Sequence, residues 1–62
     1  MTSIEIGVIN AMRKRGGSFV KALAETYVLA DPENRERIKD AFPEYWMRYL
    51  QIALDTPTDN EP

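Results

Sequence analysis

The apolar residues in the middle of the chain recur at helical spacing. Between positions 19 and 30 a set of apolar side chains falls on one side of a helix. This set comprises Phe19, Val20, Leu23, Ala24, Tyr27, Val28 and Ala30. Lys21, Glu25 and Thr26 fall outside it. The pattern predicts a helix over residues 18–30.

The N-terminal segment has a clear helix start but a less regular apolar pattern. Thr2 and Glu5 form a capping box, in which each side chain accepts a hydrogen bond from the other residue's backbone N–H. The apolar residues divide into Ile4, Val8, Ala11 and Met12 on one helix face, and Ile6 and Ile9 outside it. Residues 4–9 also alternate like a short strand, but such a strand would lack a partner in this chain. We therefore expect a helix over residues 3–15.

Two glycines separate the first two helices. Gly16 is expected to adopt the left-handed conformation that commonly ends a helix. Ser18 is expected to cap the next helix, because its hydroxyl can accept a hydrogen bond from an unpaired N–H of the first turn.

Prolines mark the remaining boundaries. Asp31 and Pro32 suit the cap and first position of a helix, which predicts a third helix over residues 32–41. Pro43 then removes one backbone hydrogen bond, so the helix either kinks there or ends and restarts. The second alternative gives a fourth helix over residues 43–54. The expected fold is all-α, a small bundle of three or four helices that is open to dimerisation.

The last helix carries an unusually wide apolar surface. Its inward face is expected to hold Tyr45, Tyr49, Ile52 and Ala53, which continue the face begun by Ile38 and Phe42. Its apolar surface extends around the side through Trp46, Met47, Leu50 and Leu54. Only a narrow polar strip remains, made of Glu44, Arg48, Gln51 and Asp55. This apolar arc is about twice the width of an ordinary surface helix.

Two interpretations of this surface overlap. Trp46 is a central core residue if a tiny bundle needs every large side chain. Alternatively, the helix offers an interface to a second copy or to a target protein, since Trp, Tyr and Met are enriched at such surfaces. The residues predicted for this interface are Tyr45, Trp46, Met47, Leu50 and Leu54.

Length and composition limit the classes of function. The chain has 62 residues, no Cys and no His, so disulfides, thiolate metal sites and the commonest general base are excluded. We expect neither an enzyme nor a cofactor or metal site. One domain over residues 1–55 with a frayed polar tail over 56–62 is expected, and a homodimer would help so small a core. No apolar run approaches the ~20 residues of a membrane span, and no leader is visible, so a cytoplasmic protein is expected.

Basic residues raise a nucleic-acid alternative. Arg13, Lys14 and Arg15 are candidate phosphate contacts, although they also suit the negative end of the first helix. In this alternative the second and third helices form a helix-turn-helix, with Arg35 and Arg37 also touching phosphates. Without nucleic acid, the charges of the third helix are interpreted as a solvated face that comprises Glu33, Arg35, Glu36, Arg37, Lys39 and Asp40. The net charge of -2 argues against a DNA-binding regulator.

Several runs resemble a group of small helical proteins encoded by phages and prophages. They are GGSFV at 16–20, ALAE at 22–25, ADPEN at 30–34 and AFPEYW at 41–46. The resemblance covers about half the chain, and no catalytic motif accompanies it. It implies an accessory phage protein that works in the host cytoplasm by binding and modulating a bacterial protein, for example a component of a defence system.

Overall fold

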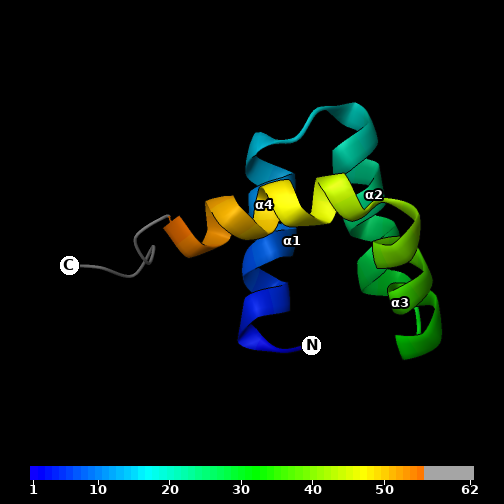
Figure 1. Cartoon of the computed structure of the whole chain (residues 1–62). Coiled ribbons are helices and arrows are strands. Elements are labelled where there is room, and N and C mark those ends of the chain that lie inside the picture. Colours follow the sequence, from blue (N-terminus) through cyan, green and yellow to red (C-terminus); the bar gives the residue numbers. More distant parts are fainter. Residues whose placement is uncertain (56–62) are drawn as a thin grey trace.

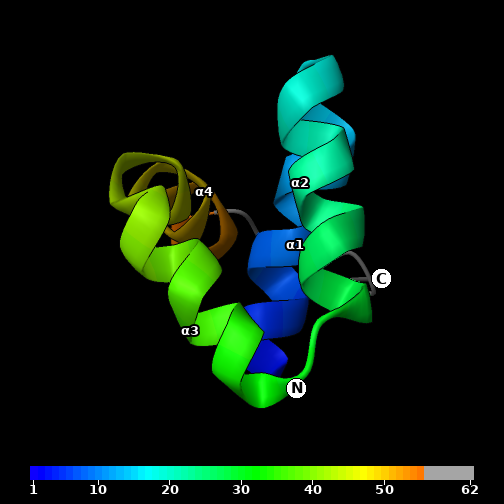
Figure 2. The same cartoon turned by 90° about the vertical axis from the view of Figure 1, so that its right-hand side faces the viewer.

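Four helices in sequence order make up the fold. The computed structural model describes residues 1–55, which form α1 (Ser3–Arg15), α2 (Ser18–Leu29), α3 (Pro32–Ala41) and α4 (Pro43–Asp55). α2 returns beside α1, α3 turns back toward α4, and α4 lies across α1 (Figures 1 and 2). The all-α expectation is confirmed, and the first segment is a helix rather than a strand. The predicted tail over 56–62 lies outside the described residues.

The core of the described chain comes mainly from α1 and α2. Its buried members are Val8, Ile9, Ala11, Met12, Val20, Leu23, Ala24, Tyr27 and Tyr49. Ile9 is only 2% exposed, so its predicted place outside the apolar face was wrong. The reason is that α2 and α4 both pack against α1, which widens the arc that α1 buries. Ile4, which was placed on that face, is 57% exposed in the first turn.

The turn between α1 and α2 uses its glycines differently from the prediction. Gly16 is extended, with φ -79° and ψ 156°, and Gly17 rather than Ser18 occupies the cap position of α2. A Cβ on Gly16 would overlap the Val20 side chain and come within 2.5 Å of the Met12 carbonyl oxygen. Gly16 is therefore required for space, and not for a left-handed backbone.

Arg35 joins the start of α3 to the end of α2. Its Nε and Nη2 donate hydrogen bonds of 3.1 Å each to the carbonyl oxygens of Tyr27 and Val28. These carbonyls belong to the last turn of α2, where backbone acceptors lack helical partners. The interpretation of Arg35 as part of a solvated face was therefore wrong. Asp31 caps α3 as predicted, since its side chain accepts a 2.8 Å hydrogen bond from the Asn34 N–H.

Pro43 marks the boundary between two separate helices, α3 and α4. α3 ends at Ala41, Phe42 has the non-helical angles φ -131° and ψ 57°, and α4 begins at Pro43. The Trp46 N–H donates a 3.1 Å hydrogen bond to the Phe42 carbonyl, which opens the new helix. Proline fits this first position because its nitrogen has no hydrogen to leave unpaired.

Side chains from all four helices meet around Tyr27. The Tyr27 hydroxyl of α2 donates a 2.5 Å hydrogen bond to Glu5 Oε2 of α1, and the Tyr27 ring lies 5.0 Å from the ring of Trp46 on α4. Lys39 of α3 places its Nζ 3.8 Å from Glu5 Oε2 and 5.1 Å from the Trp46 ring centre. We call these four residues the Tyr27 cluster. Lys39 was also assigned to the solvated face, and this was wrong because its side chain is only 26% exposed and its ammonium lies against Glu5 and the Trp46 ring.

The Tyr27 cluster shifts the titration of its members. The Thr2 backbone N–H, which donates to Glu5, and then the Tyr27 hydroxyl lower the pKa of Glu5 from 4.5 to about 2. Burial, followed by the hydrogen bond to Glu5, raises the pKa of Tyr27 to about 12. Both shifts favour an ionised carboxylate held by a neutral phenol at neutral pH.

The two glycines of the first turn should respond oppositely to alanine. We expect Gly16→Ala to cost about 1–3 kcal/mol, because the new methyl group overlaps Val20 and the Met12 carbonyl. Gly17→Ala should be neutral or stabilise by up to about 1 kcal/mol, since its Cβ meets nothing within 4 Å and φ is -78°. Urea unfolding of both variants measures the difference, and equal effects would contradict this assignment.

Acid should weaken the Tyr27 cluster. Because the pKa of Glu5 falls from 4.5 to about 2 on folding, its carboxylate stabilises the fold above pH 4.5, and this stability is lost as the pH falls toward 2. Glu5→Gln should cost about 1–2 kcal/mol at pH 7 and lose less stability than wild type over that interval. Thermal unfolding across this pH range measures both effects. The control is Glu33→Gln, which removes an exposed carboxylate and should keep the wild-type acid dependence.

Candidate protein interface

The inward face of α4 is fixed where this helix crosses α1. A Cβ on Gly7 would lie 3.5 Å from the Ala53 Cβ, which locates the crossing point. Tyr49, one turn earlier on α4, is 6% exposed, and Ile52 is half-buried against the same core. The predicted inward face of α4 is therefore the face that packs on the core.

The outward apolar side of α4 remains uncovered. Met47 and Leu54 are each 62% exposed, and Leu50 between them is half-buried. The spacing of i, i+3 and i+7 aligns these three side chains along one side of the helix. We call Met47, Leu50 and Leu54 the α4 flank.

Trp46 and Tyr45 are packed against the protein's own aromatic residues. Trp46 contacts Tyr27, while the Tyr45 ring lies 5.7 Å from Phe19 and 6.1 Å from Phe42. Both residues are half-buried. Of the five residues predicted for the interface, Met47 and Leu54 are therefore the two with exposed side chains. Tyr45, Trp46 and Leu50 are half-buried.

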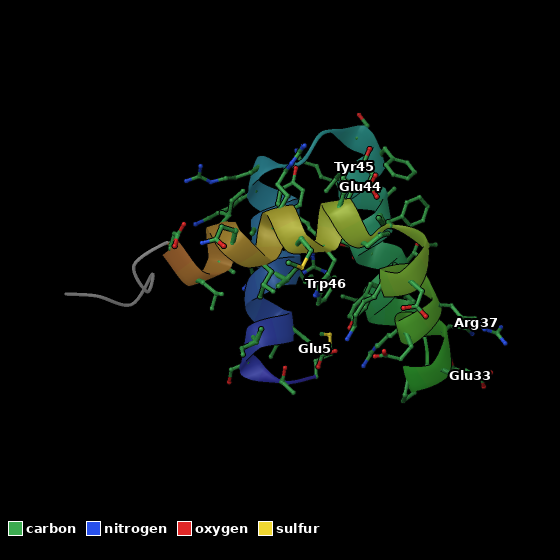
Figure 3. All side chains as sticks on the ribbon, in the orientation of Figure 1. Glu5, Glu33, Arg37, Glu44, Tyr45 and Trp46 are labelled. Carbon is green, nitrogen blue, oxygen red and sulfur yellow. The ribbon has the colours of Figure 1, made fainter. Side chains whose placement is uncertain are left out.

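The labelled side chains show which side of α4 faces each half of α1. Figure 3 shows Trp46 on the side of α4 toward the N-terminal half of α1, where Glu5 lies, and Tyr45 with Glu44 on the other side. Leu50 follows Trp46 by one turn and projects to the same side. Ile4, one turn before Gly7 on α1, is a further exposed apolar side chain, at 57%.

The predicted phosphate contacts are at the other end of α1 from Ile4. Arg13 forms a two-pronged ion pair with Glu25, in which Nε is 2.6 Å from Oε2 and Nη2 is 3.0 Å from Oε1. This hydrogen bond raises the pKa of Arg13 and lowers that of Glu25. Lys14 and Arg15 are exposed beside it in the last turn. The structure does not bring these three residues together with the α4 flank.

The arginines that a DNA-binding role would need on α3 already have partners within the chain. Arg35 donates to the end of α2, and Arg37 Nη2 lies 3.0 Å from Glu33 Oε2. The contacts to α2 occupy two donors of the Arg35 guanidinium, whereas the exposed Arg37 pair is a weak surface ion pair. No observation on the described residues favours the helix-turn-helix alternative.

A second apolar surface was not foreseen from the sequence. It is a hollow of about 460 Å³ between α2 and α3. Its lining comprises Thr26, Leu29, Ala30, Asn34, Arg37, Ile38, Ala41 and Phe42. Leu29 is 85% exposed, the highest value among the large apolar side chains described. The available signal was that Leu29 falls outside the core face of its own helix.

Comparison with models of known protein families, with curated proteins and with solved structures gave no match for this chain. The helices of the described region are too short and too polar to cross a membrane. Within residues 1–55, no three His, Cys, Asp or Glu side chains are grouped so that they could hold a metal ion. The exposed surfaces are therefore the features of the described residues that bear on function.

Substitutions at the exposed and half-buried positions of the α4 flank should differ in their effect on the free energy of unfolding. Met47→Asp should change the free energy of unfolding by no more than about 0.5 kcal/mol, because the side chain is largely in solvent. Leu50→Asp should cost at least about 2 kcal/mol, because Leu50 packs against the core. Urea titrations at low protein concentration test this. A stable Leu50→Asp variant would contradict the packing described for Leu50.

Proposed function

We propose that this protein acts by protein–protein contact and that the α4 flank is its binding surface. The observation that carries the proposal is the exposure of Met47 and Leu54, at 62% each, along one side of a helix whose other side forms the core. Contiguous exposed apolar side chains rimmed by polar residues mark interaction surfaces on small soluble proteins.

The composition of this surface suits a partner protein. Its centre carries no charge, and Glu44, Arg48 and Gln51 lie exposed on the polar side of the same helix. An apolar centre with a polar rim is the usual arrangement of interfaces. Met47 can adapt its shape to a partner because its side chain is unbranched and flexible. Leu50 is held against the core and gives the surface a fixed base.

The sequence resemblance supports a class of partner. Small phage proteins with these sequence runs are expected to work in the bacterial cytoplasm by binding a host protein. We therefore propose an accessory phage protein that modulates a bacterial protein, with a defence component as one target, and that also forms a homodimer. The α4 flank supports the mode of contact, whereas the partner's origin rests on the resemblance.

Affinity capture from a bacterial lysate tests the binding surface. Met47→Asp places a charge at the most N-terminal exposed position of the α4 flank, where burial by a partner makes desolvation costly, so capture of the partner should fall at least about tenfold. Asn10→Asp is the matched control: it adds the same charge at an exposed position on α1 and should leave capture unchanged.

Quantitative mass spectrometry of the captured proteins provides the readout, and circular dichroism establishes that both variants are folded. If a folded Met47→Asp variant retains every partner of the wild-type protein, the α4 flank is not the binding surface.

A further inference from the structure

The hollow between α2 and α3 is a second candidate docking surface. Its apolar lining comes from Leu29 and Ala30 on one side and from Ile38, Ala41 and Phe42 on the other. Figure 2 shows the ribbons of α2 and α3 diverging from the turn that joins them. We call it the α2–α3 groove.

The apolar edge of the groove continues along α2. Phe19 is 53% exposed, and its ring lies 5.6 Å from that of Phe42 at the end of α3. Ten residues of helix separate Phe19 from Leu29, which corresponds to about 15 Å. That length accommodates two to three turns of a partner helix, which would insert apolar side chains at i, i+3 and i+7.

The chain itself contains a helix with this pattern. Met47, Leu50 and Leu54 have the spacing i, i+3 and i+7 and extend over about 10 Å. We propose that the α2–α3 groove of one copy receives the α4 flank of a second copy. This inference rests on the proposed function, because it names a partner for the same binding surface.

Charge complementarity supports a second copy as the occupant. Arg37 is the charged residue in the groove lining, and its side chain is 71% exposed. Its pair with Glu33 is a surface ion pair of the kind that contributes little and is readily exchanged. On α4, the acidic residue Glu44 is one turn from Met47, on the neighbouring side of the helix. Docking of the α4 flank therefore brings a carboxylate toward the groove's guanidinium.

The area that a stable interface requires also favours the pairing of two different surfaces. A standard interface buries about 800 Å² on each partner. The whole molecule has an accessible surface of 4449 Å². Three side chains packed against their own copies around a two-fold axis would supply only a small part of the required area. A helix laid in a groove contacts both walls and gains area from α2 and α3 as well.

Pairing of a flank with a groove has a defined consequence for assembly. The two surfaces are different, so once one flank is docked, the remaining flank and groove either pair with each other, which closes a two-fold dimer, or bind a further copy. A variant that lacks a working flank still offers a groove, and a variant that lacks a working groove still offers a flank. An equimolar mixture of the two should therefore form a complex of two chains and stop there.

The test uses Met47→Asp to block the flank and Leu29→Asp to block the groove, both at exposed positions. Sedimentation velocity should show self-association of wild type and of Asn10→Asp, with at least tenfold weaker association of each blocked variant alone. In the equimolar mixture, the intact flank of one variant should bind the intact groove of the other with wild-type affinity. The mass of this complex should be that of two chains. Circular dichroism on each variant establishes that it retains its helical structure, so that weaker association is not caused by unfolding.

Other outcomes overturn the inference and separate it from the proposed function. If Leu29→Asp associates like wild type while Met47→Asp does not, the groove is not used but the α4 flank remains a binding surface. If both blocked variants are monomeric and their mixture is also monomeric, the contact is not a flank in a groove. If the wild-type protein is monomeric at all concentrations, a second copy is not the occupant, and lysate capture alone decides the proposed function.

Discussion

The hydrogen bond from Tyr27 to Glu5 is the point on which the arrangement of the four helices depends. Tyr27 is 1% exposed, and it joins α1 through its hydroxyl, α4 through its ring and α3 through Lys39 and Arg35. A buried phenol needs a partner for its hydroxyl, and the Glu5 carboxylate provides a strong one. α3 buries no residue of its own, so these polar and cation–π contacts largely determine its position.

The same cluster explains why the surface of α4 divides as it does. Trp46 is the largest side chain of this helix, and it packs against Tyr27 beneath the Lys39 ammonium. Aromatic rings bury more area than any aliphatic side chain, so a core this small gains most by taking up Trp46. The residues further around the helix, Met47 and Leu54, then remain 62% exposed in the part of the chain that the structure describes. The exposed flank is thus a consequence of how the core is completed.

Local signals in the sequence were sufficient to predict the helices, but not their mutual contacts. The Thr2–Glu5 capping box, Asp31 and Pro43 each act through bonds within a few residues, so the helix bounds could be predicted. The roles of Gly16 and Lys39 were not predicted correctly, because each depends on a residue of another helix. Gly16 leaves room for Val20 of α2, and Lys39 lies over the ring of Trp46 on α4. For the site, helical periodicity identified the flank. The groove was missed because it exists only where α2 and α3 come together.

If both proposals hold, one surface serves two competing contacts. A flank docked in the groove of a second copy is unavailable to any other protein, so self-association lowers the concentration of free flanks by mass action. Binding to a foreign partner would then be strongest, per chain, at low protein concentration and would dissociate the assembly at high concentration. The affinity of the groove for the flank would set the concentration at which this change occurs. In a chain with so little surface, self-association would thereby regulate partner binding without a separate regulatory site.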